Sequence, residues 1–416
     1  MRKPEGVERL YVDFDSFFAS AEQHLQPSLR GRPVGIIPLD TPHTGLIAVS
    51  REGKRLGLKR GVWAREARAL CPDLVLVPAR HDRYVALHTE IVRVVDRVAP
   101  VTGVRSIDEI VCALLPSEQA RGREIGRQVK QALAQEIGPT LTCSVGLGPN
   151  ELLAKIAAEM EKPDGLVVLH PADLPGPLLK LPLLDVPGIA KGNARRLAEA
   201  GVRTMADFWA LAPKHARAIW GNVEGERLWA LLRGYAVERP ETSRSMFGHG
   251  RVLPQSWRNP EKAGACARYL TVKAARRMRR AGFAARVLGL WFTDRRSAGW
   301  YGEDRFPPAF DDHALLARLS RLLDHARRQG EAPFRSRSVH VALSGIVPIQ
   351  DVMRDLFETG EDGRRRRRWE QLSLIADQLN KRYRRPVLSL GPAVEPPGGY
   401  AGAKIAFNRI PDPEDF

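Results

Sequence analysis

Two acidic pairs interrupt apolar stretches within the first 110 residues of the chain. The stretch YVDFDSFFASAE contains Asp13 and Asp15, two residues apart. The stretch VRSIDEIVCALL contains Asp108 and Glu109. Side chains two residues apart in a β-strand share a face, so we expect Asp13 and Asp15 to lie side by side. Carboxylates in an apolar strand are costly to bury unless a cation compensates their charge.

The acids therefore predict a site for two Mg²⁺ ions, because Mg²⁺ prefers hard oxygen ligands and retains several waters. Two such ions, about 4 Å apart, lower the pKa of an attacking hydroxyl and stabilise the leaving oxygen of an in-line displacement at phosphorus. The alternative is that the acids flank strand ends, face solvent and do no chemistry. The repeat of the pattern in two apolar contexts favours the metal site.

The segments around these acids predict an α/β or α+β domain over about the first 170 residues. Strands are expected where short apolar runs are bounded by turn residues, and helices where apolar residues recur with helical spacing. The expected strands are Leu10–Phe14, Pro33–Pro38, Gly45–Ser50, Val104–Leu115 and Leu141–Gly146. Helices are expected after Phe17 and over residues 82–98 and 118–137.

The residue composition and the expected secondary structure change twice after residue 170. Proline-rich residues lead into short helices up to about residue 235, and a linker, YAVERPETSRS, precedes a third unit. The third unit is expected to contain a basic helix at Pro260–Ala281 and strands at Ala285–Phe292 and Arg337–Leu343. Residues 351–416 are predicted to form a polar tail that contains the run Arg364–Arg368.

The net charge favours a polyanionic partner. The 416 residues carry a formal charge of +17, with a pI near 10.1, and residues 241–350 hold 20 Lys and Arg against 9 Asp and Glu. Neutralising phosphates with basic side chains releases counterions, so an excess of this size favours nucleic acid. A basic but merely solvated surface is the alternative.

The remaining composition predicts a soluble protein of a reducing cytoplasm. Four widely separated cysteines show neither zinc-site spacing nor a disulfide framework, which favours a reducing compartment. The first residues lack the apolar core of a signal peptide, and no run of about 18 apolar residues occurs, so no membrane association is expected.

Four motifs, in order and at fitting spacing, resemble the Y family of DNA polymerases over roughly residues 9–350. The motifs are YVDFDSFFASAE, SIDE, SVGLGPNELLAKIAAEMEKPDGL and DVPGIAKGNARRL. The resemblance implies a multidomain α+β right-hand fold that adds deoxynucleotides to a primer end, with small fingers tolerant of damaged template. Its implied domains are a palm at 1–22 and 75–170, fingers at 23–74, a helical thumb at 171–238, a little finger at 242–350 and a C-terminal tail at 351–416.

The resemblance also implies the metal ligands of the two Mg²⁺ ions. Asp13, Asp108 and Glu109 match the family's metal-binding carboxylates, and the Phe14 carbonyl would be a further ligand. Asp15 is expected to support the site structurally.

The implied nucleotide-binding residues are Phe17, Phe18, Arg51, Lys54 and Lys162. Phe18 matches the steric gate, whose ring leaves no room for a 2′-hydroxyl, and the adjacent Phe17 is expected to pack in the core. Lys162 matches a lysine that reaches the triphosphate. Arg51 and Lys54 depart from the family's tyrosine and arginine. The departure keeps positive charge, and Arg51 could still grip phosphate bidentately. The aromatic hydroxyl is lost, however, and Lys54 cannot replace an arginine at a bidentate site, which puts nucleotide affinity and catalytic rate in question.

Two basic regions are expected to hold primer–template DNA. The stretch PGIAKGNARRL predicts a helix-hairpin-helix in which Gly188 permits a tight turn and helix-start N–H groups face phosphate, assisted by Lys191 and Arg195. In the little finger, the expected contacts are Lys273, Arg276, Arg277, Arg280, Arg335 and Arg337. A structural turn and a solvated helix face are the respective alternatives.

The segment QLSLI resembles the peptide by which bacterial polymerases dock on the sliding clamp, with Gln371, Leu372, Leu374 and Ile375 as its anchors. The same segment also fits an amphipathic helix from Gln371 to Tyr383. The arginine run before it would be a linker that touches DNA, or a solvated one.

The expected activity is therefore DNA-directed DNA synthesis by a monomer, with deoxynucleoside triphosphates, primer–template DNA and the sliding clamp as its partners. The second hypothesis is a catalytically silent Y-family subunit that binds DNA and the clamp, against which the retained acids argue. A nucleotide cyclase ranks lower, because it has no use for the hairpin or the basic third unit.

Overall fold

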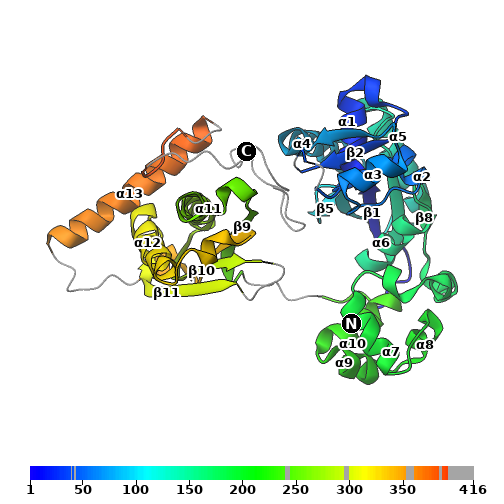
Figure 1. Cartoon of the computed structure of the whole chain (residues 1–416). Helices are drawn as coiled ribbons and strands as arrows, with labels where there is room; N and C mark the ends of the chain where they lie inside the picture. The colour runs from blue at the N-terminus through cyan, green and yellow to red at the C-terminus, as the bar shows by residue number, and fades with distance from the viewer. Residues whose placement is uncertain are drawn as a thin grey trace. The chain divides into compact units, whose positions relative to one another are not determined.

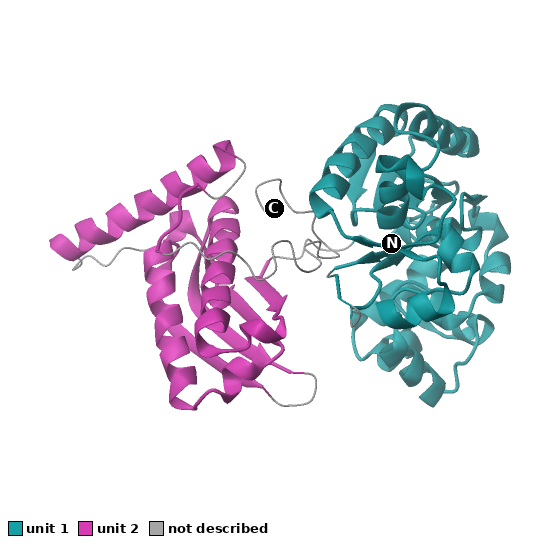
Figure 2. Cartoon of the chain, turned by 45° about the horizontal axis from the view of Figure 1, so that its top comes forward, with its two compact units in different colours: residues 1–240, 403–411 teal, residues 241–402, 412–416 magenta. Residues whose placement is uncertain are grey.

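The computed structural model describes residues 1–38, 40–41, 44–238, 244–294, 299–352, 360–383 and 387–391. The chain divides into two compact units near residue 240 (Figures 1 and 2), between the predicted thumb and little finger. Residues 239–243, in the middle of the predicted linker, and all residues after 391 lie outside the described ranges.

The first unit is built on a five-stranded sheet in the order β5-β6-β1-β7-β8. These strands are β1 (Arg9–Phe14), β5 (Val101–Val104), β6 (Glu109–Ala113), β7 (Cys143–Gly148) and β8 (Leu166–Val168). β1 is central, antiparallel to both β6 and β7, and its apolar residues are almost fully buried. The predicted single strand over 104–115 is wrong, because the chain turns between β5 and β6 and places Asp108 just before a strand.

Helices cover the two faces of this sheet. α5 (Gly122–Glu136) packs on the side chains of Val145 and Leu147, and α4 (His81–Val98) packs beside it. The opposite face receives α6 (Glu151–Met160), since Gly146 alternates with those valine and leucine positions. A Cβ at Gly146 would lie 2.0 Å from the Ala154 carbonyl oxygen, so only glycine allows α6 to approach β7 this closely.

The chain between α1 (Phe17–Leu25) and α4 forms a small separate layer. Its sheet has the order β3-β2-β4, from β2 (Val34–Ile37), β3 (Ala48–Val49) and β4 (Val75–Pro78). Two short helices accompany it, α2 (Arg51–Arg55) and α3 (Ala64–Leu70). Its own apolar cluster includes Ile37, Leu46 and Leu58.

Short helices follow the palm-like sheet, as the proline-rich sequence predicts. They are α7 (Lys191–Glu199), α8 (Met205–Ala210), α9 (Pro213–Trp220) and α10 (Val223–Leu232). Their apolar side chains share one cluster with Leu153 and Ile156 of α6. Asn150, the N-cap of α6, donates hydrogen bonds to the carbonyl oxygens of Leu231 and Tyr235, which ties these helices to the sheet.

The second unit is a four-stranded antiparallel sheet, in the order β11-β10-β12-β9, with helices on one face. The strands are β9 (Met246–Val252), β10 (Phe283–Thr293), β11 (Trp300–Ala309) and β12 (Ser338–Ser344), and β13 (Val347–Pro348) pairs with β10. α11 (Pro260–Arg280) and α12 (Asp312–Arg328) bury their apolar faces against the sheet.

A last helix, α13 (Glu361–Arg382), packs on this unit, so the prediction of a polar tail after residue 351 is wrong for these residues. It is held by polar contacts that an apolar periodicity does not reveal. The predicted multidomain α+β fold is confirmed by the observed sheets and helices. None of the helices in the described ranges is both long and apolar enough to span a bilayer.

Candidate active site

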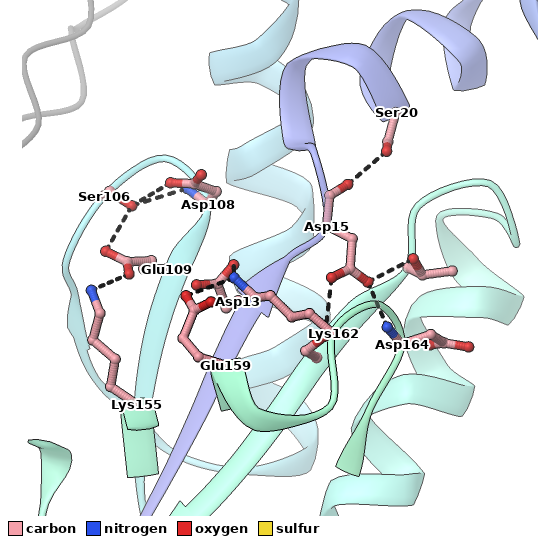
Figure 3. Close-up of polar contacts among 12 residues, drawn as sticks. Asp13, Asp15, Ser20, Ser106, Asp108, Glu109, Lys155, Glu159, Lys162 and Asp164 are labelled. Carbon is pink, nitrogen blue, oxygen red and sulfur yellow. Dashed lines mark hydrogen bonds and ion pairs between the residues drawn. The ribbon is translucent and has the colours of Figure 1, made fainter. Parts of the chain in front are cut away.

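The pairing of β1 with β6 brings the three predicted metal-binding acids together (Figure 3). Asp13, at the end of β1, lies opposite Glu109 at the start of β6. The backbone N–H of Phe14 donates to the carbonyl oxygen of Asp108 at 2.9 Å. Residues almost a hundred positions apart thus converge at one end of the central strand pair.

Two lysines hold these carboxylates. Nζ of Lys162 lies 2.8 Å from Oδ1 of Asp13 and 2.7 Å from Oε1 of Glu159. Lys155 forms an ion pair with Glu109, and the Ser106 hydroxyl donates to both Asp108 and Glu109.

Burial disfavours the ionised form of two of the acids, Asp13 and Asp108. Burial raises the pKa of Asp13 to about 7 although Lys162 opposes the shift, and burial also raises the pKa of Asp108. Among the described residues, no three acidic, histidine or cysteine side chains already form a metal cage. The donor set fits Mg²⁺ chemically, since it offers hard carboxylate oxygens whose charge is under-compensated. Binding would require Asp13 and Glu109 to turn from their lysine partners.

Asp15 does not share a face with Asp13, contrary to the expectation from a continuous strand. β1 ends at Phe14, and the carboxylate of Asp15 accepts hydrogen bonds from Thr142 at 2.9 Å, Ser144 at 3.0 Å and the Asp164 N–H at 2.9 Å. These bonds pin the turn before α1 to the neighbouring strand and to the loop of Lys162 (Figure 3).

Lys155 and Glu159 were not singled out from the sequence, yet both touch the site. Both lie on α6, which Gly146 admits against the sheet, and their spacing of four residues puts them on one helix face. That spacing directly after an apolar strand is the signal that could have identified them.

The two adjacent phenylalanines have different surroundings. Phe17 is 3% exposed and packs edge-on against Phe14, with ring centroids 5.9 Å apart. Phe18 is half-buried and stacks on Tyr84 at 4.7 Å, and Tyr84 donates to Glu22. The stacking fixes the orientation of the Phe18 ring.

The predicted triphosphate cations Arg51 and Lys54 lie on α2. The Ser50 hydroxyl caps this helix by accepting from the Gly53 N–H at 3.3 Å, and it also accepts from the Val34 N–H at 3.0 Å. Arg51 is half-buried and Lys54 is exposed.

The predicted hairpin residues are exposed at the start of α7. Gly188 has φ 98°, a backbone conformation that favours glycine, and Lys191 is the first residue of the helix. Arg195 is 78% exposed and lies 3.7 Å from Glu199.

The predicted basic residues of the second unit differ in accessibility. Arg276 is only 13% exposed and lies 3.4 Å from Asp377, so little of it remains for a phosphate. The other predicted residues are exposed or half-buried, and they are Lys273, Arg277, Arg280, Arg335 and Arg337.

The clamp-like segment lies within α13, in agreement with the alternative of a helix over Gln371–Tyr383. Leu372, Leu374 and Ile375 are 48%, 42% and 48% exposed, and Gln371 is exposed too. Ser373 between them is buried, so the helix turns these anchors away from the domain.

Comparison with known proteins adds an independent line of argument. Residues 12–159 match the impB/mucB/samB family, and residues 244–356 match the impB/mucB/samB family C-terminal domain. The chain is 36% identical over 384 residues to DNA polymerase IV of Moorella thermoacetica, covering 90% of this chain and 93% of the relative. It is 32% identical over 400 residues to DNA polymerase IV of Pelotomaculum thermopropionicum, covering 92% and 96%.

Solved structures share the fold. A Y-family DNA polymerase chimera of Dbh and Dpo4 matches with a TM-score of 0.69 at 24% identity, over 82% of this chain and 99% of that one. An insertion ternary complex of Dbh DNA polymerase matches with a TM-score of 0.56 over the same shares, also at 24% identity. With this fold, the family matches and the clustered acids, the chain belongs to the Y family of DNA polymerases, resembling DNA polymerase IV.

Proposed function

We propose that this polymerase extends a primer on damaged template by a two-metal mechanism at Asp13, Asp108 and Glu109. The observation that carries the proposal is the register of β1 and β6, which sets Asp13 opposite Glu109 with Asp108 bonded alongside. Two Mg²⁺ ions bound there would activate the primer 3′-hydroxyl and stabilise the departing pyrophosphate. The Phe14 carbonyl is the proposed backbone ligand.

Lys162 is proposed to exchange partners during the cycle. In the free protein it neutralises Asp13 and Glu159, and this double contact raises its pKa against the opposing effect of burial. It therefore stays protonated, and can move to the triphosphate once Asp13 has a metal partner. Arg51 and Lys54 supply further positive charge for the phosphates, without the geometry of a tyrosine and an arginine.

The proposal is tested by primer extension with Mg²⁺ and deoxynucleotides, on undamaged template and on template with a single defined lesion. Extension to and past the lesion is the expected result. A protein that binds primer–template but incorporates nothing, under any divalent ion, would instead be the silent DNA-binding subunit.

Sugar selection is assigned to Phe18. Replacing Phe18 with alanine is expected to raise ribonucleotide incorporation by about 100-fold or more relative to deoxynucleotide, because the ring that would meet the 2′-hydroxyl is gone. The measurement is the ratio of kcat/KM for the two nucleotides.

Phe17→Leu is the matched control, since Phe17 packs in the core beside Phe14. It is expected to leave the ribonucleotide ratio within about threefold of wild type. An unchanged ratio in Phe18→Ala would assign the gate to another residue.

DNA is proposed to be held without sequence readout by the α7 hairpin and by the second unit. The N–H groups at the start of α7, with Lys191 and Arg195, would face phosphates beside Gly188. Arg280, Arg335 and the other accessible basic residues of the second unit would grip the duplex, and Arg276 is left out because Asp377 engages it.

The clamp proposal uses the exposed anchors of the QLSLI segment on α13. Leu372 and Ile375 are three residues apart on a helix, so α13 would enter an apolar groove as a helix face. Leu372→Ala with Ile375→Ala is expected to weaken clamp binding about tenfold or more, measured by surface plasmon resonance. Leu388→Ala, another exposed leucine, is the control. Unchanged clamp affinity in the double variant would remove this surface from the proposal.

The protein is further proposed to act as a monomer in the bacterial cytoplasm, with the nucleoid.

A further inference from the structure

Helix α13 is fixed to the second unit by buried polar contacts. The guanidinium of Arg279, on α11, is 1% exposed and bonds Oδ2 of Asp377 and Oδ1 of Asp312, each at 2.7 Å. Ser373 accepts a hydrogen bond from the Asp312 N–H at 3.0 Å. Asn380, also buried, accepts from the N–H groups of Val387 at 2.7 Å and Leu388 at 2.9 Å. The C-terminal half of α13 is therefore an integral part of the domain.

The N-terminal half is anchored as well. Trp369 stacks on His313 of α12, with ring centroids 4.4 Å apart and planes 4° apart. Arg366 donates to the Pro308 carbonyl at 2.9 Å and to Glu370 at 3.2 Å. The anchors recur every three or four residues, which defines one inward helix face and leaves the opposite face outward.

The outward face is basic at both ends, and the exposed Leu372, Leu374 and Ile375 lie between the two basic ends. Its basic side chains are all exposed, and they are Arg364, Arg365, Arg367, Arg368, Lys381 and Arg382. The side chains of the four arginines near the start form no ion pair or hydrogen bond with any part of the chain that the structure describes. Of the acids on α13, Glu370 and Asp377 face inward and are engaged there, whereas Glu361 and Asp362 are exposed in the first turn. The six exposed basic side chains therefore still outnumber the exposed acids.

This arrangement is unfavourable in the free protein. Arg364 and Arg368 are four residues apart, and Arg364–Arg367 and Arg365–Arg368 are three apart, so like charges face one another on the helix surface. The arginines also lie near the positive end of the helix dipole. A polyanion laid along the face would relieve both effects.

We propose that α13 is a second, sequence-independent surface for the phosphate backbone of DNA, carried rigidly by the little finger. The inference takes only the identity of the partner, DNA, from the proposed function. It adds a DNA-binding surface that lies beyond residue 356, where the family match ends. From Arg364 to Arg382 the face is about 27 Å long. Duplex DNA presents roughly 16 charges over that length.

The test is a salt titration of binding to an undamaged primer–template, by fluorescence anisotropy, without metal or nucleotide. The test variant changes Arg364, Arg365, Arg367 and Arg368 to glutamine and keeps the anchor Arg366. The matched control changes four exposed arginines of the first unit to glutamine, namely Arg97, Arg121, Arg123 and Arg127. Circular dichroism checks that both remain folded.

In the test variant, the slope of log K against log salt is expected to become shallower by about 2–3, with binding about tenfold weaker or more at low salt. The control is expected to keep the wild-type slope, and lysine at the four test positions is expected to restore it. Equal slopes in test and control variants would overturn the proposal, as would loss of clamp binding with unchanged DNA binding.

Because DNA binding is measured without nucleotide incorporation, the experiment tests the DNA surface on α13 separately from the proposed catalysis. A wild-type protein that fails to extend primers refutes the proposed catalysis, and leaves the binding comparison fully interpretable.

Discussion

Replacing Asp13 with asparagine is expected to reduce nucleotide incorporation by about 1,000-fold or more, equivalent to at least about 4 kcal/mol of transition-state stabilisation. Asparagine keeps the shape of the side chain and removes the charge that would hold a divalent ion beside the primer end. The measurement is single-turnover incorporation at saturating DNA and nucleotide.

Two companion measurements make this result specific. Glu151→Gln, at the start of α6, removes a carboxylate from the exposed ion pair with Arg105 and is expected to stay within about threefold of wild type. The metal-free Asp13→Asn protein should be at least as stable as wild type, because it no longer buries a carboxylate whose pKa burial raises to about 7. Full activity in Asp13→Asn would exclude it as a metal ligand.

Replacing Arg279 with methionine is expected to lower the free energy of unfolding of the second unit by about 3–5 kcal/mol. The change fills similar volume but leaves Asp312 and Asp377, 8% and 20% exposed, without their shared cation. Urea unfolding of the full chain, followed by tryptophan fluorescence and circular dichroism, measures the loss. Limited proteolysis should cut near α13 earlier than in wild type.

The neighbouring Arg280 offers a matched control, because it is exposed at the end of the same helix. Arg280→Met is expected to change the free energy of unfolding by less than about 0.5 kcal/mol. Similar unfolding of the two variants would show that the buried ion pairs contribute little to holding α13.

Local sequence patterns were sufficient to predict the main strands and helices around the candidate site of the first unit. Leu10–Phe14 was expected as a strand because a short apolar run ends in acids, and β1 covers Arg9–Phe14. Residues 82–98 repeat apolar side chains with helical spacing, and α4 covers His81–Val98. Family membership, too, followed from four motifs, and the comparisons confirm it.

Side-chain partners between distant segments could not be predicted in the same way. The carboxylate of Asp15 bonds to Thr142 and Ser144 because Asp15 lies in the turn just after β1, which ends at Phe14. Lys155 reaches Glu109 because two glycines of β7 let α6 lie against the sheet backbone. Neither contact has a signature within its own segment.

For this protein, the sequence alone determined the strands and helices that carry the acids, and the chemistry that acids of this kind can perform. The tertiary structure decided which groups meet and which helix face is buried. Helix α13 illustrates this division. Apolar periodicity predicts that Leu372 and Ile375 are buried, but the buried face is the polar one with Ser373 and Asp377, because Asp377 pairs with Arg279. A buried charge needs its counter-charge, and that requirement outweighs the burial of two aliphatic side chains.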